Sequence, residues 1–291
     1  MSDLTPAEQL VEDGRTLSNA GDADGAERAY LAAGKLAPTW SVPLFNLGLL
    51  YKYQHRWEES LAFNQRASEL SPEDQGTWWN RGIAATALGL WPEARRCWTQ
   101  CPIADPGGGH PPDYGFGRIP LRLDPDGDGE VVWGIRLDPA RARLTNIPLP
   151  SSAFHWGDIV LNDGAAEGHR VVGDRTYPVF NVLQCLVPST LRTFIVELAS
   201  VNEAALDGLD DIAHEMGGAA EHWGATTRIL CRQCSFGVPH DHDEPGGAPA
   251  HPHCGLVAPS RETAQAILDR WLDTHSIADL ITWHEHVDPP R

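Results

Sequence analysis

A 34-residue period runs through the first third of the chain. When the sequence is aligned with itself at this offset, a glycine column and a proline column appear: Gly14, Gly48 and Gly82, and Pro38, Pro72 and Pro106. Self-similarity at such a period indicates stacked helical hairpins, because one hairpin cannot bury its apolar face alone. The glycines let two antiparallel helices approach closely, and the prolines end the second helix of each hairpin. Residues 7–108 are therefore predicted to form three helical hairpins.

Further columns of apolar, aromatic or small side chains follow the same period: Leu10, Leu44 and Trp78; Ala26, Ser60 and Ala94; Tyr30, Asn64 and Trp98; Ala33, Ala67 and Cys101. Together the columns resemble the tetratricopeptide (TPR) pattern W-x2-L-G-x2-Y…A-x3-F…P. The sequence departs from this pattern at Asp13 and Arg81, which replace Leu, at Ala85, which replaces Tyr, and at Asn64, which replaces an aromatic residue. The resemblance covers a little over a third of the chain and implies a short right-handed superhelix.

The resemblance also implies where a partner binds. In a TPR superhelix the first helices of the hairpins line the concave face, here over residues 7–20, 41–54 and 75–88. The groove-facing candidates on these helices are polar or aromatic: Asn46, Tyr53, Asn80 and Arg81, with Trp79 near the rim. We therefore expect a protein or peptide partner in this groove. The alternative is that three repeats serve only as a platform for the attached domain.

A chaperone-tail adaptor is not predicted. TPR proteins that grip the acidic C-termini of chaperones use a set of Lys, Arg and Asn side chains that face the groove. In this sequence Asn46 fits one such position, but the first repeat offers Val11 and Arg15, and the third offers Gly76 and Asn80. Most of the basic carboxylate-binding set is missing.

A Gly/Pro-rich stretch, GGGHPPDYG, follows Pro106 and is typical of a linker. Short β-like runs separated by turn residues come next: Ile119–Leu123, Val131–Leu137, Arg143–Asn146, Asp158–Asn162, His169–Val172 and Val179–Val187. We predict a linker and a small β-barrel-like domain over residues 109–188. Several phrases here are loosely similar to an uncharacterised bacterial domain family, which implies no activity: Val132-Trp133, Asn146-Ile147-Pro148, Gly157-Asp158-Ile159-Val160 and Ser189-Thr190-Leu191-Arg192.

The pattern changes again over residues 189–291. Strands and amphipathic helices are predicted in the order βαββαβ: Thr193–Leu198, Asn202–Met216, Thr226–Cys231, Gly255–Ala258, Arg261–His275 and Leu280–His286. This is the order of a ferredoxin-like α+β domain, and Asn202 and Ser260 are suitable helix N-caps. The fold class is thus a multi-domain chain: a TPR superhelix, a small β domain and a ferredoxin-like domain.

A Cys/His-rich segment, residues 231–254, interrupts this last domain between its second and third strands. It contains seven possible metal ligands: Cys231, Cys234, His240, His242, His251, His253 and Cys254. Cys-x2-Cys lets two thiolates bind one ion from a tight turn, and two histidines complete a tetrahedral set. We predict a structural zinc held by Cys231, Cys234, His240 and His242, with His251, His253 and Cys254 in reserve. Two alternatives are solvated histidines with buried thiols, and a redox Cys-x2-Cys pair.

Charge excludes some function classes. With 22 Lys and Arg against 40 Asp and Glu, the net charge of −18 repels phosphate backbones, so nucleic acid is not expected as a partner. Residues 109–291 hold 13 basic and 26 acidic side chains, which would suit a basic protein partner. No apolar run is long enough to span a membrane and no export signal is evident, so we expect a cytoplasmic protein. The 20 arginines against two lysines suggest a bacterial genome of high GC content.

The leading hypothesis is an intracellular interaction protein, of adaptor or toxin-neutralising type, with a structural zinc. An enzyme is not predicted, because the chain lacks the zincin His-Glu-x-x-His motif, the Gly-x-Ser-x-Gly elbow and glycine-rich nucleotide loops. The alternative is a metal-dependent hydrolase whose repeats recruit its substrate. The two differ in coordination: a closed four-ligand zinc site favours the first, and three ligands plus water favour the second.

Overall fold

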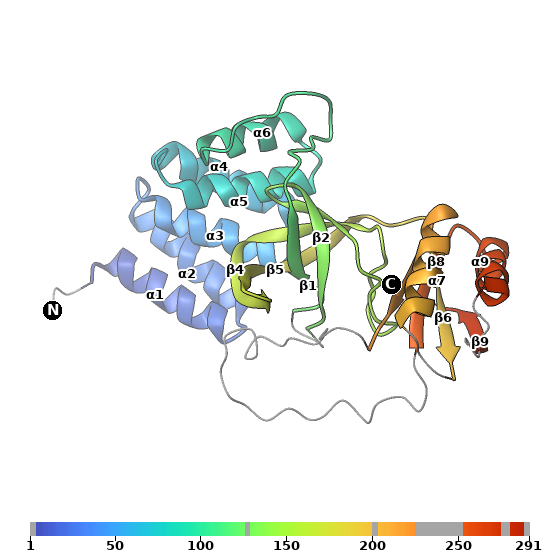
Figure 1. The fold of residues 1–291 in the computed structure, drawn as a ribbon. Coiled ribbons are helices and arrows are strands. Elements are labelled where there is room, and N and C mark those ends of the chain that lie inside the picture. The colour runs from blue at the N-terminus through green and yellow to red at the C-terminus, as the bar shows by residue number, and fades with distance from the viewer. Residues whose placement is uncertain (1–3, 126–128, 200–202, 225–252, 275–279, 288–291) are drawn as a thin grey trace. The chain divides into compact units, whose positions relative to one another are not determined.

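The computed structural model describes residues 4–125, 129–199, 203–224, 253–274 and 280–287 (Figure 1). The chain divides into two compact units, residues 1–115 with 137–140 and residues 116–136 with 141–291. The coarse prediction of a helical N-terminal part followed by a β-rich part with two sheets is confirmed. The domain boundaries at residues 108 and 188 stay predictions.

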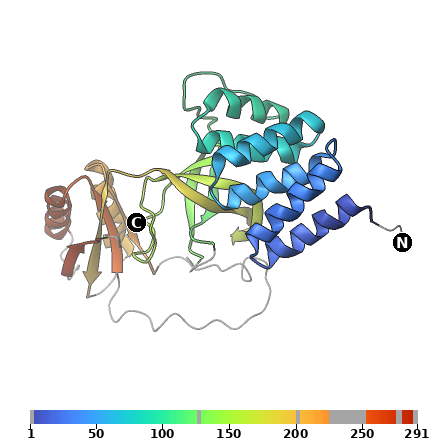
Figure 2. The same cartoon turned by 180° about the vertical axis from the view of Figure 1, so that it is seen from behind.

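Three antiparallel helix pairs make up the first unit (Figure 2). The hairpins are α1 (Pro6–Asn19) with α2 (Ala23–Leu36), α3 (Ser41–Tyr53) with α4 (Trp57–Leu70), and α5 (Gln75–Ala87) with α6 (Trp91–Gln100). A capping box, in which Thr5 and Glu8 bond each other's backbone N–H groups, starts α1. Among the first helices, α1 contacts α3 and α3 contacts α5, which forms one continuous face. The TPR arrangement predicted from the sequence is confirmed.

Close packing within each hairpin explains two of the sequence columns. A Cβ atom at each column glycine would lie 2.4 to 2.5 Å from a side chain of the second helix: Gly14 from Tyr30, Gly48 from Asn64, and Gly82 from Trp98. No Cβ atom tolerates such a distance, so glycine and the large side chain opposite it are required together. The large side chain therefore fills the space inside its own hairpin.

Asn64, the departure from an aromatic residue, is hydrogen-bonded to Ser60, whose hydroxyl joins the two helices of this hairpin. Ser60 Oγ donates to the carbonyl of Gly48 at 2.8 Å, and Asn64 Nδ2 donates to the carbonyl of Ser60 at 2.8 Å. Both side chains are fully buried, so these bonds offset the cost of removing polar groups from water. In the second hairpin Ser60 therefore forms the hydrogen bond between the helices, and Asn64 fills the position that Tyr or Trp holds in the others.

The start of the Gly/Pro-rich stretch is bound to the last helix of the stack. Arg95 on α6 forms an ion pair with Asp105. Its guanidinium also donates to the carbonyls of Gly107 and Gly109, at 3.1 and 2.7 Å. The five donors of a guanidinium in a fixed fork suit such a cluster of oxygens. Residues 105–109 are therefore part of the repeat unit and not a free linker.

A closed five-stranded barrel begins the second unit. Its strands follow the chain order β1 (Arg118–Arg122), β2 (Val131–Asp138), β3 (Arg141–Leu144), β4 (Ile159–Val172) and β5 (Arg175–Val187). β1 closes the barrel by pairing in parallel with β5, Leu121 opposite Phe180. Across this seam, buried Arg122 donates to Asn181 Oδ1 at 2.9 Å and to the carbonyl of Glu167 at 3.1 Å.

One long strand replaces two predicted ones. The sequence indicated separate strands at Asp158–Asn162 and His169–Val172, but β4 runs through both and pairs with β5 along its length. The residues between them form bulges, where the register shifts between Asn162 and Ala166 and again before His169. Glycine at a bulge weakens the alternating pattern on which strand prediction depends, and Gly168 has a φ of +83°.

Among the described residues, a four-stranded sheet and two helices complete the unit. The elements are β6 (Arg192–Leu198), α7 (Glu203–Glu215), β7 (Ala219–His222), β8 (His253–Ala258), α9 (Arg261–Thr274) and β9 (Leu280–Glu285). The strand order is β7-β8-β6-β9, and all three pairings are antiparallel. The core includes Phe194, Leu209 and Trp271, all fully buried. The strand predicted at Thr226–Cys231 lies outside the described residues, and β7 was not predicted.

Residues 146–147, which follow β3 of the barrel, form hydrogen bonds with this sheet. The carboxylate of Glu221 on β7 accepts hydrogen bonds from Asn146 Nδ2 at 2.6 Å and from the backbone N–H of Ile147 at 2.7 Å. Trp223 Nε1 donates to the carbonyl of Ile147 at 3.0 Å, and the two side chains share an apolar cluster with Val257. Charge-assisted bonds of this kind are the stronger class. Within the second unit, the barrel and the sheet therefore share a polar and apolar junction.

Candidate functional site

The face formed by the first helices carries most of the predicted groove residues. Asn46 lies on α3 and donates from Nδ2 to the carbonyl of Val42 at 2.9 Å, one turn earlier. Tyr53 ends the same helix with 54% of its surface exposed, whereas Asn46 and Asn80 are buried. Tyr53 is thus the predicted residue that a binding partner can reach most directly in this structure.

Lys52, which is 2% exposed, joins this set, although its place there is not evident from the sequence. Its ammonium donates to Asn80 Oδ1 at 3.2 Å, from α3 to α5, and lies 4.5 Å from the centre of the Tyr53 ring. A cation over an aromatic ring is attracted by the ring quadrupole. The repeat alignment gives the position of Lys52 within its helix. Its contact with Asn80, 28 residues away, forms between two hairpins, so the pattern of a single repeat does not reveal it.

Trp79 and Arg81 lie on the same helix and point to different neighbours. The Trp79 ring meets Trp98 edge to face with centroids 5.4 Å apart. Arg81 occupies the usual leucine position and reaches the second helices of the stack: its guanidinium pairs with Glu93 at 2.5 Å and donates to Ser68 Oγ at 2.9 Å. Arg81 therefore holds α5 to α4 and α6. Trp79 likewise packs on α6, so the first-helix face is left to Asn46, Lys52, Tyr53 and Asn80.

Two cysteines, Cys97 on α6 and Cys101 at its C-cap, belong to the packing of the stack. Cys97 is fully buried and Cys101 nearly so, and both are free thiols. Burial disfavours the thiolate and raises the pKa of Cys97 to about 12 and that of Cys101 to about 11, above the ordinary 9.0. Thiols held in the protonated form are poor nucleophiles and poor metal ligands.

The predicted zinc ligands Cys231, Cys234, His240 and His242, with reserve ligand His251, lie outside the described residues. Among the residues that the structure does describe, no group of three or more His, Cys, Asp or Glu side chains is arranged to hold a metal. The other reserve ligands, His253 and Cys254, begin β8. Cys254 is fully buried in the core and His253 is half-buried, as expected for successive strand residues that point to opposite faces.

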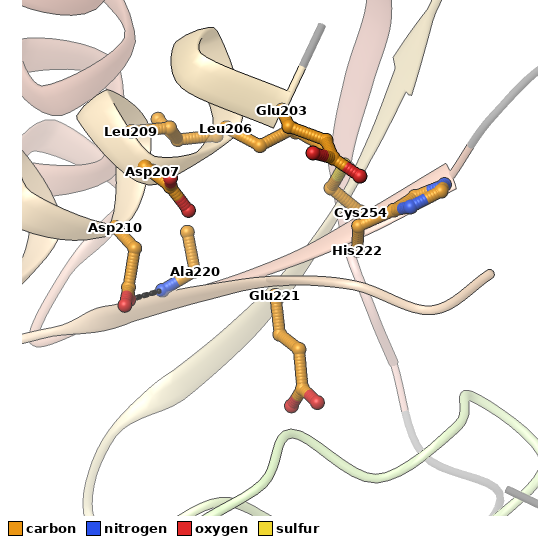
Figure 3. Close-up of a pocket in the computed structure, with 9 residues that line it drawn as sticks. All are labelled: Glu203, Leu206, Asp207, Leu209, Asp210, Ala220, Glu221, His222 and Cys254. Carbon is orange, nitrogen blue, oxygen red and sulfur yellow. Dashed lines mark hydrogen bonds between the residues drawn. The ribbon is translucent and has the colours of Figure 1, made fainter. Parts of the chain in front are cut away.

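A cavity of about 560 Å³ opens between α7 and the edge strand β7 (Figure 3). Its lining comes from both elements and from one residue of β8: Glu203, Leu206, Asp207, Leu209, Asp210, Ala220, Glu221, His222 and Cys254. Four of these are carboxylates and none is Lys or Arg. His222 and Cys254 are direct partners in the β7–β8 register, which places them on the same face of the sheet. Burial raises the pKa of the Cys254 thiol to about 12.

The contribution of His222 to this cavity is not evident from the sequence. A lone histidine after an alanine-rich stretch has no spacing that indicates a ligand. The available signal was the acidic spacing of α7, where Glu203, Asp207 and Asp210 recur at intervals of four and three residues and so share one helix face.

Comparisons with known proteins concern the helical part. No protein-family model matches the chain, and no curated protein sequence matches it. The second TPR domain of Spaghetti, bound to an HSP90 peptide, is 20% identical with a TM-score of 0.32, over 33% of this chain and 89% of that one. The TPR2B domain of yeast Sti1, in an Hsp70 complex, is 20% identical with a TM-score of 0.32, over 33% of this chain and 76% of that one. The Sgt2 TPR domain from Aspergillus fumigatus is 17% identical with a TM-score of 0.32, over 34% of this chain and 66% of that one.

None of the helices in the described ranges combines the length and apolar character needed to cross a membrane.

Proposed function

We propose that this chain is an interaction protein that holds a protein or peptide partner on the first-helix face of its TPR stack. One observation supports this most: α3 and α5 are joined on this face by the Lys52–Asn80 hydrogen bond, beside the exposed ring of Tyr53. Lys52 and Asn80 are themselves buried, so their bond fixes the two helices under the Tyr53 ring, and the exposed ring supplies the apolar contact that is typical of binding surfaces.

The partner is not proposed to be an acidic chaperone tail. Lys52 is one basic group on this face, but Val11 and Gly76 stand where the carboxylate-binding TPR proteins carry polar or basic side chains. Residues 193–291 contain 5 basic and 16 acidic side chains, so the negative charge is concentrated in the last part of the chain. Such a field favours encounter with a basic protein, as in an adaptor or a toxin-neutralising protein.

Photocrosslinking tests this assignment. With the photoreactive amino acid p-benzoylphenylalanine in place of Tyr53, irradiation of cells is expected to yield one predominant covalent adduct that survives denaturing purification. The matched control carries the same probe in place of Leu36, which is 60% exposed at the end of α2, away from the first-helix face. Identical adduct patterns from both positions, or no adduct from Tyr53, would count against partner binding by this face.

We further propose a structural zinc bound by Cys231, Cys234, His240 and His242, with His251 and His253 as reserve ligands. The third predicted reserve ligand, Cys254, is buried in the core of the sheet and is not included in the proposal. The described ends of this segment support the proposal, because β7 and β8 are neighbouring antiparallel strands and the segment leaves one and enters the other. The element order β6-α7-β7-β8-α9-β9 and the strand order β7-β8-β6-β9 likewise support a ferredoxin-like domain that carries this Cys/His segment as an insertion.

Elemental analysis of the purified protein is expected to find about one zinc per chain, because four thiolate and imidazole ligands suffice for a structural site. A Cys231→Ser, Cys234→Ser double variant is expected to contain less than a tenth of that. Cys185→Ser, which changes a thiol on β5, serves as the control and is expected to retain the metal. Zinc-free wild-type protein, purified under reducing conditions without chelators, would contradict the proposal.

A further inference from the structure

The outer surface of the barrel carries arginine and aromatic side chains that the proposed function does not use. Side chains that alternate along the strands with the core residues Leu121, Val132 and Ala142 point outward. We call the following set the barrel face: Arg118 on β1, Trp133 and Ile135 on β2, Arg143 on β3, Arg170 on β4 and Tyr177 on β5.

The strand register brings these side chains together. Arg118 is the direct partner of Ile135, and Arg170 is the direct partner of Tyr177. Residues directly opposite each other in antiparallel strands share one face of the sheet. The Trp133 ring meets the Tyr177 ring edge to face, with centroids 5.0 Å apart. Side chains of different strands therefore form one continuous surface.

Two guanidinium groups lie over the ring of Trp133. The guanidinium carbon of Arg118 is 5.1 Å from the centre of the ring, and that of Arg170 is 5.2 Å from it. Arg170 Nη1 also donates to the carbonyl of Val131 at 3.2 Å. A guanidinium held on a ring keeps N–H donors for a carboxylate, and its fixed position lowers the entropy lost on binding. Two cations on one ring also repel each other, and an anion relieves that repulsion.

The arginines on the two strands that flank β2 are not neutralised. Arg118 on β1 and Arg143 on β3 are both exposed, and neither has a hydrogen bond or an ion pair with another described residue. Elsewhere in the same unit, exposed Arg192 is paired with Glu285 at 3.1 Å. Ile135, on the strand between the two arginines, is 37% exposed. The barrel face thus offers cations on both sides of an accessible apolar side chain.

The charge of the chain makes such a surface selective. Residues 116–187 hold 7 basic and 9 acidic side chains, whereas residues 193–291 hold 5 and 16. The negative field of the last part repels acidic segments, so the barrel face is the part of this unit whose charge suits them. Nucleic acid suits it less well, because a phosphate strand extends beyond the arginines into that field.

Strand spacing indicates which acidic segment fits. β1 and β3 lie on either side of β2, so they are about 10 Å apart, twice the usual spacing of neighbouring strands. In a polyproline II segment, residues three positions apart lie on the same side and are separated by about 9 Å. Two carboxylates three residues apart can therefore reach the two flanking strands together.

We propose that the barrel face binds an acidic segment of a protein partner. Its carboxylates pair with Arg118 and Arg143, and an apolar side chain between them packs on Ile135. The ring of Trp133 orients the guanidinium of Arg118 and adds apolar contact area. This inference goes beyond the proposed function, because it assigns a separate contact surface to the β-rich unit.

Titration calorimetry with the full-length protein tests the proposal without an identified partner. The probe is the peptide acetyl-Gly-Glu-Leu-Pro-Glu-Gly-amide, which carries two carboxylates three residues apart. We expect a Kd of about 100 μM at low ionic strength. Binding should weaken as salt is added, because exposed ion pairs are screened. The analogue with Gln in place of both Glu residues is expected not to bind.

Matched variants separate the barrel face from the general charge of the protein. Arg118→Gln with Arg143→Gln is expected to weaken binding of the acidic peptide at least tenfold. The control, Arg28→Gln with Arg66→Gln, removes the same charge from exposed arginines of α2 and α4, and is expected to stay within twofold of wild type. Circular dichroism confirms that both variants are folded.

Equal weakening by both double variants, or equal binding of the Glu and Gln peptides, would overturn the proposal. If oligothymidylate bound more tightly than the peptide and lost its binding in the Arg118→Gln, Arg143→Gln variant, the barrel face would be a nucleic-acid site instead. A wild-type dimer in analytical ultracentrifugation that this variant dissociates would assign the face to a second copy of the chain and would likewise overturn the proposal.

Discussion

A Gly218→Ala variant is expected to lose about 3 kcal/mol or more of the free energy of unfolding of the β-rich unit, at the upper end of overpacking costs. Gly218 follows the end of α7, and its N–H donates to the carbonyl of Ala213 at 2.7 Å. A Cβ atom there would lie 1.9 Å from the carbonyl oxygen of Val257. That oxygen belongs to β8, an inner strand of the sheet, so it cannot move without disturbing the pairing on both sides.

Urea unfolding, followed by the circular dichroism of the strands, measures this loss. Gly117→Ala is the matched control, since a Cβ atom there meets nothing within 4 Å, and it is expected to change stability by less than about 0.5 kcal/mol. If Gly218→Ala unfolds at the same urea concentration as Gly117→Ala, then the backbone at Gly218, after α7, does not approach Val257 of β8 this closely.

Two glycines in the helical unit are expected to respond to alanine with opposite signs. Gly82→Ala should destabilise the unit by about 2 to 3 kcal/mol, because the new Cβ atom would lie 2.4 Å from the fully buried ring of Trp98. Gly34→Ala should stabilise it by about 0.5 to 1 kcal/mol, because alanine is the better helix former and the nearest atom, Pro43 Cβ, is 3.8 Å away.

Both helical variants can be compared by thermal and urea unfolding of the intact protein, monitored at the helical signal. The pair tests the packing more sharply than either variant does alone, since both substitutions add one methyl group inside a helix. A shift of the same sign and size in both would mean that helix propensity alone determines the outcome, and that Trp98 does not occupy the space over Gly82.

The helical part was predictable because its determinants repeat and are local. Gly14 and Tyr30 meet within one hairpin, 16 residues apart, and the same contact recurs one period later. Each column in the sequence thus reports one packing contact three times. Groups that join different hairpins carry no such redundancy, which is why Asn80 was identified as a groove residue but its donor Lys52 was not.

The β-rich part was predicted less completely because its strands are short or interrupted. β7 has four residues, Ala219–His222, which are too few to show an alternating pattern. The strand was instead predicted at Thr226–Cys231, where apolar and β-branched residues are more frequent. The junction of Glu221 with Asn146 spans 75 positions, and a lone acidic residue gives no sign of such a contact. The cavity beside α7 is lined on its other side by β7. The sequence therefore indicated the acidic face of the helix but not the opposite wall of the cavity.

The fastening of residues 146–147 by Glu221 and Trp223 sets an order of events during synthesis. The three stacked hairpins have their packing partners once α6 has left the ribosome, before any strand of the barrel is made, so the helical unit can fold early. The barrel ends at Val187, yet its segment at Ile147 obtains its hydrogen-bond partners only when the chain has grown past Trp223. Contacts so distant in sequence form slowly. Until then the barrel exposes the apolar side chain of Ile147, and a nascent chain stalled before residue 221 would be the species most in need of a chaperone.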